Sequence, residues 1–271
     1  MLPLFESFIR ERQYLNNVSP RTLEWHRQSL RCLPCETPTQ QQLNDMVIAL
    51  RARGIKPSGV NCKARSINAY LKWSGQSVKI AAMKEPKLVM PTYSEQDVKR
   101  LVQYKAKSKH ERKVHLLILL LLDTGARLSE ALNVHVSEIN MADCLVLLKG
   151  KGDRERLVPF SFEMRKHIYR FVQEYKPCGL LLATDTGTAM SRCNALRDVK
   201  RLCVQAGSSV PPRALHSMRH TFAASFVRSG ASVFHLQKQL GHQTLAMSQK
   251  YCSLNVSDLQ AVHKRVSLLS K

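Results

Sequence analysis

The segment of residues 110–123 contains the longest apolar run of the chain, and it constrains the fold more than any other part of the sequence. It predicts an α-helix that is apolar on almost every side, and such a helix belongs at the centre of a large core. Its most apolar part, residues 116–122, is far shorter than the roughly 20 residues needed to cross a bilayer. Gly125 follows where a helix can end in a left-handed turn.

The first 83 residues predict helices only. Ser19 and Pro20 form a typical N-cap with proline at the first helical position. Residues 37–40 fit a capping box for a second helix. A third helix is expected to begin near Ser58 and to stop at Gly75.

Residues 84–93 contain Pro86 and Pro91 and break the helical periodicity. This segment is typical of an extended linker between domains. Ser94 then caps a new helix. We therefore expect a small helical domain over residues 1–83, a linker over 84–93 and a larger domain over 94–271.

The larger domain changes pattern once. Residues 145–148 and 156–159 are short strand-like runs on either side of residues 149–153, which indicates a β-hairpin. Helical patterns return from Glu163, with one predicted helix over residues 219–229, and a capping box at residues 255–260 predicts a short C-terminal helix. The predicted fold class is mainly α, with a small antiparallel β-sheet in the larger domain.

The chain has 42 Lys and Arg against 20 Asp and Glu, a formal net charge of +22. The basic residues are spread along the whole chain, so the folded body is expected to face a polyanion, as in a nucleic-acid-binding protein. The basic face that carries Lys63 and Arg65 fits DNA contact and simple solvation equally well. With no amphipathic basic anchor or lipidation signal, we expect no membrane partner.

The eight cysteines are scattered, and only Cys32 and Cys35 form a CxxC pair. A zinc site would need a second pair, and a redox motif would need a βαβ context. We therefore expect incidental, reduced thiols. Because no secretion signal is apparent, the expected location is cytoplasmic and nucleoid-associated.

Several separated segments carry side chains suited to phosphodiester chemistry. Arginine forks match phosphate oxygens and stay protonated, and a tyrosine hydroxyl can act as a covalent nucleophile. His216 and Arg219 lie three residues apart and share one helix face. Singly, each residue has an ordinary alternative: His216 as a cap or core residue, His242 as a helix C-cap, Tyr251 as a packed aromatic.

Taken together, these segments resemble the tyrosine recombinase (phage integrase) family over residues 94–254, and the helical domain before them matches the family's core-binding domain in size and position. Tyr251 lies nine residues after His242, as is usual in the family, whereas Ser253 stands where the family often has histidine. The matching segments are Thr124-Gly125-Ala126-Arg127-Leu128-Ser129-Glu130, Lys149-Gly150-Lys151-Gly152 before Arg156-Leu157-Val158-Pro159, His216-Ser217-Met218-Arg219, Leu240-Gly241-His242 and Tyr251.

The resemblance implies a nucleophile and a phosphate clamp. Tyr251 would attack a backbone phosphate and leave a 3′-phosphotyrosyl link with a free 5′-hydroxyl. Arg127 and Arg219 would stabilise the negative charge that builds on the nonbridging oxygens. Glu130 would support Arg127.

The remaining implied roles concern protons. His216 would accept the tyrosine proton, and His242 would bond the phosphate. Lys151 would protonate the leaving 5′-oxygen; strand periodicity alone does not separate it from Lys149, and the family pattern selects Lys151. The resemblance therefore implies six catalytic residues: Arg127, Lys151, His216, Arg219, His242 and Tyr251.

We therefore expect a site-specific DNA recombinase or integrase that works as a homo-tetramer on two DNA sites. It would need no cofactor, metal or ATP, because the arginines take the charge role of a metal and the phosphotyrosine keeps the bond energy. Two alternatives remain at this point. One is a type IB topoisomerase, and the other is a non-catalytic DNA-binding accessory protein on the same fold.

Overall fold

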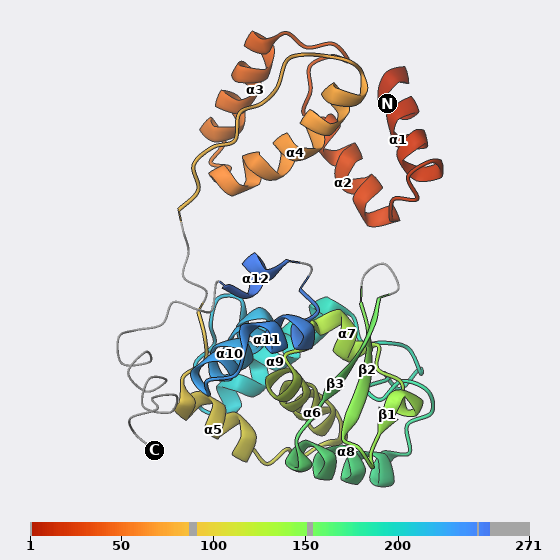
Figure 1. Ribbon diagram of the computed structural model, residues 1–271, viewed down its shortest axis with the longest axis vertical. Coiled ribbons are helices and arrows are strands. Elements are labelled where there is room, and N and C mark those ends of the chain that lie inside the picture. The colour runs from red at the N-terminus through yellow and green to blue at the C-terminus, as the bar shows by residue number, and fades with distance from the viewer. Residues whose placement is uncertain (1, 87–90, 151–153, 243, 250–271) are drawn as a thin grey trace, which may run out of the picture. The chain divides into compact units, whose positions relative to one another are not determined.

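The computed structural model describes residues 2–86, 91–150, 154–242 and 244–249 (Figure 1). Contacts along the chain divide it into two compact units, Met1–Leu88 and Val89–Lys271. Each unit has its own apolar core. No helix among the described residues is both long and apolar enough to span a membrane.

The first unit consists of helices. Phe8 and Tyr70 are fully buried in its core and meet edge to face, with ring centroids 5.6 Å apart, a favourable arrangement for aromatic pairs. The Tyr70 hydroxyl donates to the carbonyl oxygen of Glu36 (2.8 Å), which satisfies the polar end of the ring. The helices are α1 (Pro3–Tyr14), α2 (Pro20–Leu30), α3 (Gln40–Ala52) and α4 (Pro57–Trp73).

The capping box of α3 lies two residues after the predicted one. Thr39 is the N-cap: its hydroxyl accepts from the main-chain N–H of Gln42, and the Gln42 side chain accepts from the N–H of Thr39. The prediction over residues 37–40 was therefore wrong in register. Both Thr37 and Thr39 precede a glutamine by three residues, so the local pattern does not distinguish them.

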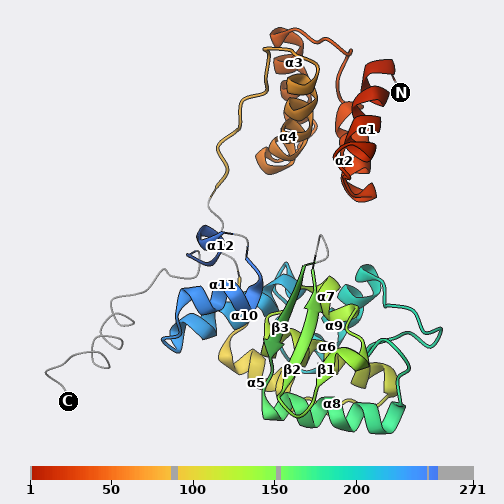
Figure 2. The same cartoon turned by 45° about the vertical axis from the view of Figure 1, so that its right-hand side comes forward.

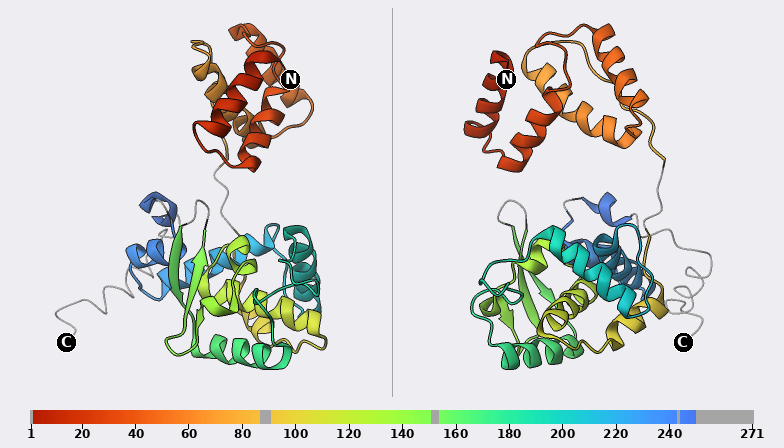
Figure 3. Two further views of the ribbon diagram at one scale, coloured as in Figure 1. Left: turned by 90° about the vertical axis from the view of Figure 1, so that its right-hand side faces the viewer. Right: turned by 180° about the vertical axis from the view of Figure 1, so that it is seen from behind.

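The second unit surrounds α6 (Lys109–Thr124). Every residue of α6 from Val114 to Leu121 is buried, and the helix packs against α5, α7, α8, α9 and α10. Figure 3 shows the second unit from two further sides. This confirms the central apolar helix predicted from the sequence. The other helices are α5 (Glu95–Gln103), α7 (Leu128–Leu132), α8 (Phe162–Tyr175), α9 (Arg192–Gln205), α10 (Ala214–Arg228), α11 (Val233–Leu240) and α12 (Leu245–Gln249).

A small antiparallel sheet completes the second unit, with strand order β1-β2-β3 (Figure 2). It contains β1 (Ile139–Asn140), β2 (Leu145–Lys149) and β3 (Glu155–Pro159). Val146 pairs with Val158 and Leu148 with Arg156, and the three apolar residues of these pairs are buried. The predicted hairpin is confirmed, as is the mainly α fold class with a small antiparallel sheet.

Helix α10 begins at Ala214, five residues before the helix predicted over residues 219–229. Pro211 and Pro212 end the preceding extended segment, and the helix starts soon after them. His216 and Arg219 therefore both lie inside α10. The predicted C-terminal helix lies outside the described residues.

Candidate active site

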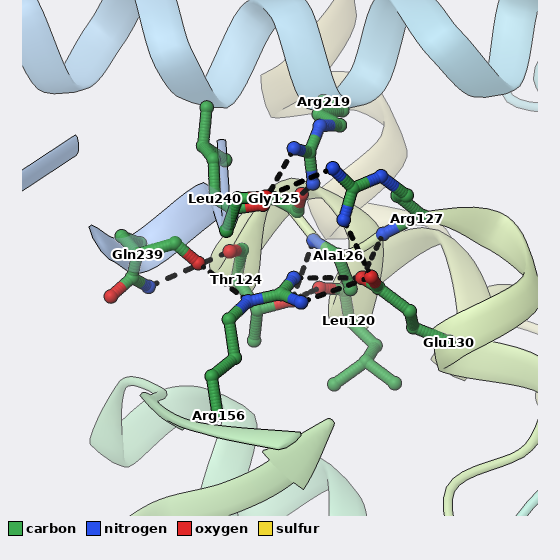
Figure 4. A network of polar contacts seen from close by, with 11 residues as sticks. Leu120, Thr124, Gly125, Ala126, Arg127, Glu130, Arg156, Arg219, Gln239 and Leu240 are labelled. Carbon is green, nitrogen blue, oxygen red and sulfur yellow. Dashed lines mark hydrogen bonds and ion pairs between the residues drawn. The ribbon is translucent and has the colours of Figure 1, made fainter. Parts of the chain in front are cut away.

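A glycine turn carries Arg127 into the site. Gly125 ends α6 with φ +65°, and a Cβ there would lie 2.4 Å from Cδ1 of Phe222 and 2.7 Å from Cδ2 of Leu240. Only glycine suits both the backbone conformation and this close approach. Two residues later Arg127 is the N-cap of α7, where its main-chain N–H donates to Oε2 of Glu130 (2.8 Å) and its Nη1 donates to Oε1 (2.7 Å; Figure 4).

Arg219 projects from α10 toward the same turn. Its side chain is buried, and its guanidinium donates to two main-chain carbonyls, Gly125 O from Nη1 (2.6 Å) and Leu240 O from Nη2 (2.8 Å; Figure 4). Both acceptors are neutral. These two contacts therefore fix the direction of the guanidinium without placing a carboxylate on it.

The C-terminal end of α11 holds three guanidiniums. The last carbonyls of a helix lack partners within the helix and carry a partial negative charge, which favours cations there. Three successive carbonyls accept one bond each from three arginines of different elements. The pairs are Arg156 Nε to Gln239 O (3.0 Å), Arg219 Nη2 to Leu240 O (2.8 Å) and Arg127 Nη2 to Gly241 O (3.2 Å).

Glu130 lies between two of these arginines, and its side chain is 1% exposed. Besides the two bonds from Arg127, it accepts two from Arg156, Nη1 to Oε1 (2.9 Å) and Nη2 to Oε2 (2.7 Å). Burial by itself raises the pKa of Glu130, but the bonds from Arg156 and Arg127 outweigh it and lower the pKa to about 2. Glu130 is therefore an ionised carboxylate near neutral pH.

His216 stands on the first turns of α10 beside the arginines. Its pKa is lowered from the usual value by partial burial and then by the positive charges of Arg219, Arg213 and Arg127. The ring of His220 meets it edge to face, with centroids 5.7 Å apart. His216 is thus a neutral imidazole near pH 7, the form that can accept a proton.

His242 follows the left-handed C-cap Gly241 of α11 (φ +63°). Its Nδ1 lies 2.8 Å from Oγ of the buried Ser248 on α12, which fixes the ring. Burial first, and then the charges of Arg219 and Arg127, lower its pKa to about 4, so this imidazole is also neutral near pH 7.

The structure thus brings together four of the six residues predicted from the sequence: Arg127, Arg219, His216 and His242. Lys151 and Tyr251 lie outside the described residues. The chain is described up to Lys149 and Gly150 on one side of Lys151, and up to Gln249 before Tyr251.

Two residues that hold the site together were missed by the sequence analysis. Arg156 was assigned only to a strand, although alternation along β3 places Arg156 on the same face as the buried Val158 and leaves Leu157 63% exposed. A cation on the core-facing side of a strand needs a buried carboxylate as its partner. The position of Arg156 in the strand pattern was therefore a signal in the sequence that it forms an internal ion pair. Ser248 gave no comparable signal.

The chain is similar to known proteins over most of its length. The model of the phage integrase family matches residues 92–258. The tyrosine recombinase XerA of Pyrococcus furiosus is 26% identical over 241 residues, which cover 86% of this chain and 82% of the relative. The tyrosine recombinase XerC of Staphylococcus haemolyticus is 26% identical over 228 residues, covering 79% of this chain and 76% of the relative.

Solved structures show the same fold. The Tn1549 transposon integrase in complex with transposon right end DNA superposes with a TM-score of 0.79 at 18% identity, covering 97% of this chain and 98% of that one. The XerH site-specific recombinase bound to palindromic difH substrate gives a TM-score of 0.72 at 16% identity, covering 98% and 84%. The chain belongs to the phage integrase family, and it is a tyrosine recombinase.

Proposed function

We propose that this chain cleaves and rejoins double-stranded DNA at a specific site through a 3′-phosphotyrosyl intermediate formed on Tyr251. The observation that carries the proposal is the seating of Arg127 and Arg219 on successive carbonyls at the end of α11, beside two neutral histidines. Hydrogen-bond donors that are held in place and directed at the developing negative charge usually make the largest single contribution to enzymatic rate enhancement.

The two arginines suit the charge of a phosphoryl transition state. Arg219 is held by neutral carbonyls, and Arg127 keeps 36% of its side chain exposed while Glu130 orients it. Both guanidiniums stay protonated and are held by their contacts, so little reorganisation is needed when charge builds on the nonbridging oxygens. They stabilise the negative charge that a metal ion stabilises in metal-dependent nucleases. The proposed cleavage requires neither metal nor ATP.

His216 and His242 are both neutral near pH 7, so each ring has one nitrogen that can accept a proton and one that can donate. His216, with its lowered pKa, accepts the phenolic proton of Tyr251 as the tyrosine oxygen bonds to phosphorus. When the hydroxyl of Ser248 donates to Nδ1 of His242, the ring proton is on Nε2, from which it bonds a phosphate oxygen.

The general acid is proposed to be Lys151. Lys149, the neighbouring candidate, is engaged elsewhere: its Nζ lies 2.6 Å from Oε1 of Glu138 and 3.7 Å from Oε1 of Glu155, and these partners raise its pKa. A lysine with a raised pKa, held by carboxylates, is a poor donor to the 5′-oxygen. As cleavage proceeds, the bond from phosphorus to the 5′-oxygen breaks and Lys151 provides the proton for that oxygen.

The partner is double-stranded DNA, as the net charge of +22 and the DNA-bound relatives of the same fold support. We assign residues 1–83 as a DNA-binding core-binding domain, 84–93 as a linker and 94–271 as the catalytic domain. Four copies would assemble on two sites for strand exchange.

This function can be tested with a plasmid that carries two copies of a DNA fragment chosen because the protein binds it. Excision or inversion of the DNA between the copies is expected. Relaxation of supercoils without rearrangement would indicate a type IB topoisomerase activity. Binding without either reaction would contradict the proposal and indicate an accessory DNA-binding role.

A further inference from the structure

Arg156 is a half-buried arginine on β3, and its three guanidinium nitrogens all donate to described partners. Nη1 and Nη2 bind the two oxygens of Glu130, and Nε binds the carbonyl oxygen of Gln239. Its side chain is 14% exposed, against 36% for Arg127. With these donors occupied inside the protein, Arg156 is poorly placed to bind a phosphate itself.

The packing leaves this guanidinium little freedom. A Cβ built on Gly241 would lie 3.1 Å from Nη1 of Arg156 and 3.2 Å from its Cζ, tighter than ordinary contacts. On the other side of the network, a Cβ on Gly150 would lie 3.4 Å from Oε1 of Glu130. The main chain therefore lies close against both members of the Arg156–Glu130 pair.

The charges around Glu130 suggest why a second arginine is there. Glu130 orients Arg127 through two bonds, but a buried carboxylate bound to Arg127 alone would cancel the charge that Arg127 presents outside. Arg156 adds a positive charge that binds the same carboxylate through both oxygens, the strongest geometry for such a pair. The network then keeps an excess of positive charge next to Arg219.

We infer that Arg156 is a positioning residue whose charge neutralises Glu130, so that Glu130 can orient Arg127 without cancelling the charge that Arg127 offers to the scissile phosphate. The inference rests on the proposed cleavage reaction. It deepens that proposal by assigning a role to a residue whose described hydrogen-bond partners are Glu130 and Gln239.

Variants at Arg156 separate charge from shape. Arg156→Met removes the charge and keeps much of the volume, and Arg156→Lys keeps the charge and loses the bidentate fork. In single-turnover cleavage of a nicked suicide substrate, we expect Arg156→Met to be about 10- to 100-fold slower than wild type. This is less than the roughly 100- to 1000-fold lost when a donor that contacts the developing charge is removed, because Arg156 acts through Arg127. Arg156→Lys should be several-fold faster than Arg156→Met.

The double variant Arg156→Met/Glu130→Gln is the decisive comparison. If Arg156 acts by neutralising Glu130, removing the carboxylate as well should restore at least several-fold of the rate lost in Arg156→Met. A purely structural role predicts the opposite, because the second substitution removes further hydrogen bonds from the same network. A double variant no faster than Arg156→Met would overturn the inference.

Two modified substrates identify which group Arg156 serves. A methylphosphonate at the cleavage site lacks one nonbridging negative charge, so the defect of Arg156→Met should shrink on it, and we expect the same of Arg127→Met. A 5′-bridging phosphorothiolate, whose thiolate leaves without a proton, should leave the defect unchanged. Rescue by the phosphorothiolate would show that Arg156 acts on Lys151 instead, and would overturn the inference.

Arg154→Met is the matched control, because Arg154 is on the same hairpin and loses the same charge outside the network. It should cleave within a few-fold of wild type. Circular dichroism and thermal melting of each variant establish that it is folded, and if Arg156→Met does not fold, Arg156→Lys on the same modified substrates carries the test. Wild-type cleavage together with an unaffected Arg156→Met would refute this inference and leave the proposed function intact.

Discussion

Glu130 binds Arg127 twice, once through the main chain and once through the side chain. Oε2 accepts from the N–H of Arg127 at 2.8 Å, and Oε1 accepts from Nη1 at 2.7 Å. The three-residue spacing is that of an N-cap and the third residue of a helix, so one carboxylate both starts α7 and orients the guanidinium. The position of Arg127 therefore depends on the local structure of the chain around it.

The turn before Arg127 should tolerate no side chain. In Gly125→Ala the added Cβ would clash with the side chains of Phe222 and Leu240, and the alanine would have to adopt a positive φ. We therefore expect a loss of about 2–4 kcal/mol in the free energy of unfolding. Cleavage should also slow, because Gly125 O is a hydrogen-bond acceptor of Arg219.

Gly207→Ala is the control for this substitution. Gly207 has a similar φ of +67° but no atom within 4 Å of the added Cβ. It should lose only about 1 kcal/mol, the backbone cost alone. Urea denaturation measures both values, and equal losses would show that the packing against Phe222 and Leu240 contributes nothing.

The lowered pKa of His216 predicts the acid side of the pH–rate profile. Burial and the neighbouring arginines disfavour the protonated ring, so the neutral base is lost only as the pH falls below the ordinary histidine pKa of about 6.5. Single-turnover cleavage should therefore remain constant from pH 7.5 to about 6.5 and decline below that. A decline that begins well above pH 6.5 would contradict the neutral role of His216.

How far the sequence determines this structure differs between elements. The helix over residues 110–123 and the hairpin were predicted because their patterns are strong and local. The start of α3 was not, because Thr37 and Thr39 offer equivalent caps. The role of Arg156 depends on Glu130, a carboxylate 26 residues away. Tertiary packing determines which carboxylate pairs with such a cation, and no local sequence pattern predicts it.

Lys151 and Lys149 should differ in their response to a modified leaving group. Lys149 is bound by Glu138 and Glu155, so Lys149→Ala should reduce cleavage only a few-fold. Lys151→Ala should abolish most cleavage of an ordinary substrate and recover on a 5′-bridging phosphorothiolate, since a thiolate needs no proton to leave. Recovery confined to Lys149→Ala would move the general acid to that residue.

DNA binding should weaken steeply with salt, while cleavage should survive EDTA. With a net charge of +22, several phosphates are neutralised, and the logarithm of the binding constant should fall linearly against log salt by about 0.9 per phosphate. Filter binding at four salt concentrations measures the slope. A strict requirement for Mg²⁺ in cleavage would refute the proposal that Arg127 and Arg219 suffice.

The central claim is that Tyr251 forms a covalent bond to DNA within the arginine and histidine site. The direct measurement is a denaturing gel of wild type and Tyr251→Phe after incubation with a labelled suicide substrate, with binding followed in parallel by mobility shift. We predict a denaturant-resistant adduct, mapped by mass spectrometry to Tyr251, for wild type only, and nearly equal DNA binding for both. An adduct that persists in Tyr251→Phe, or maps to another residue, would contradict the account.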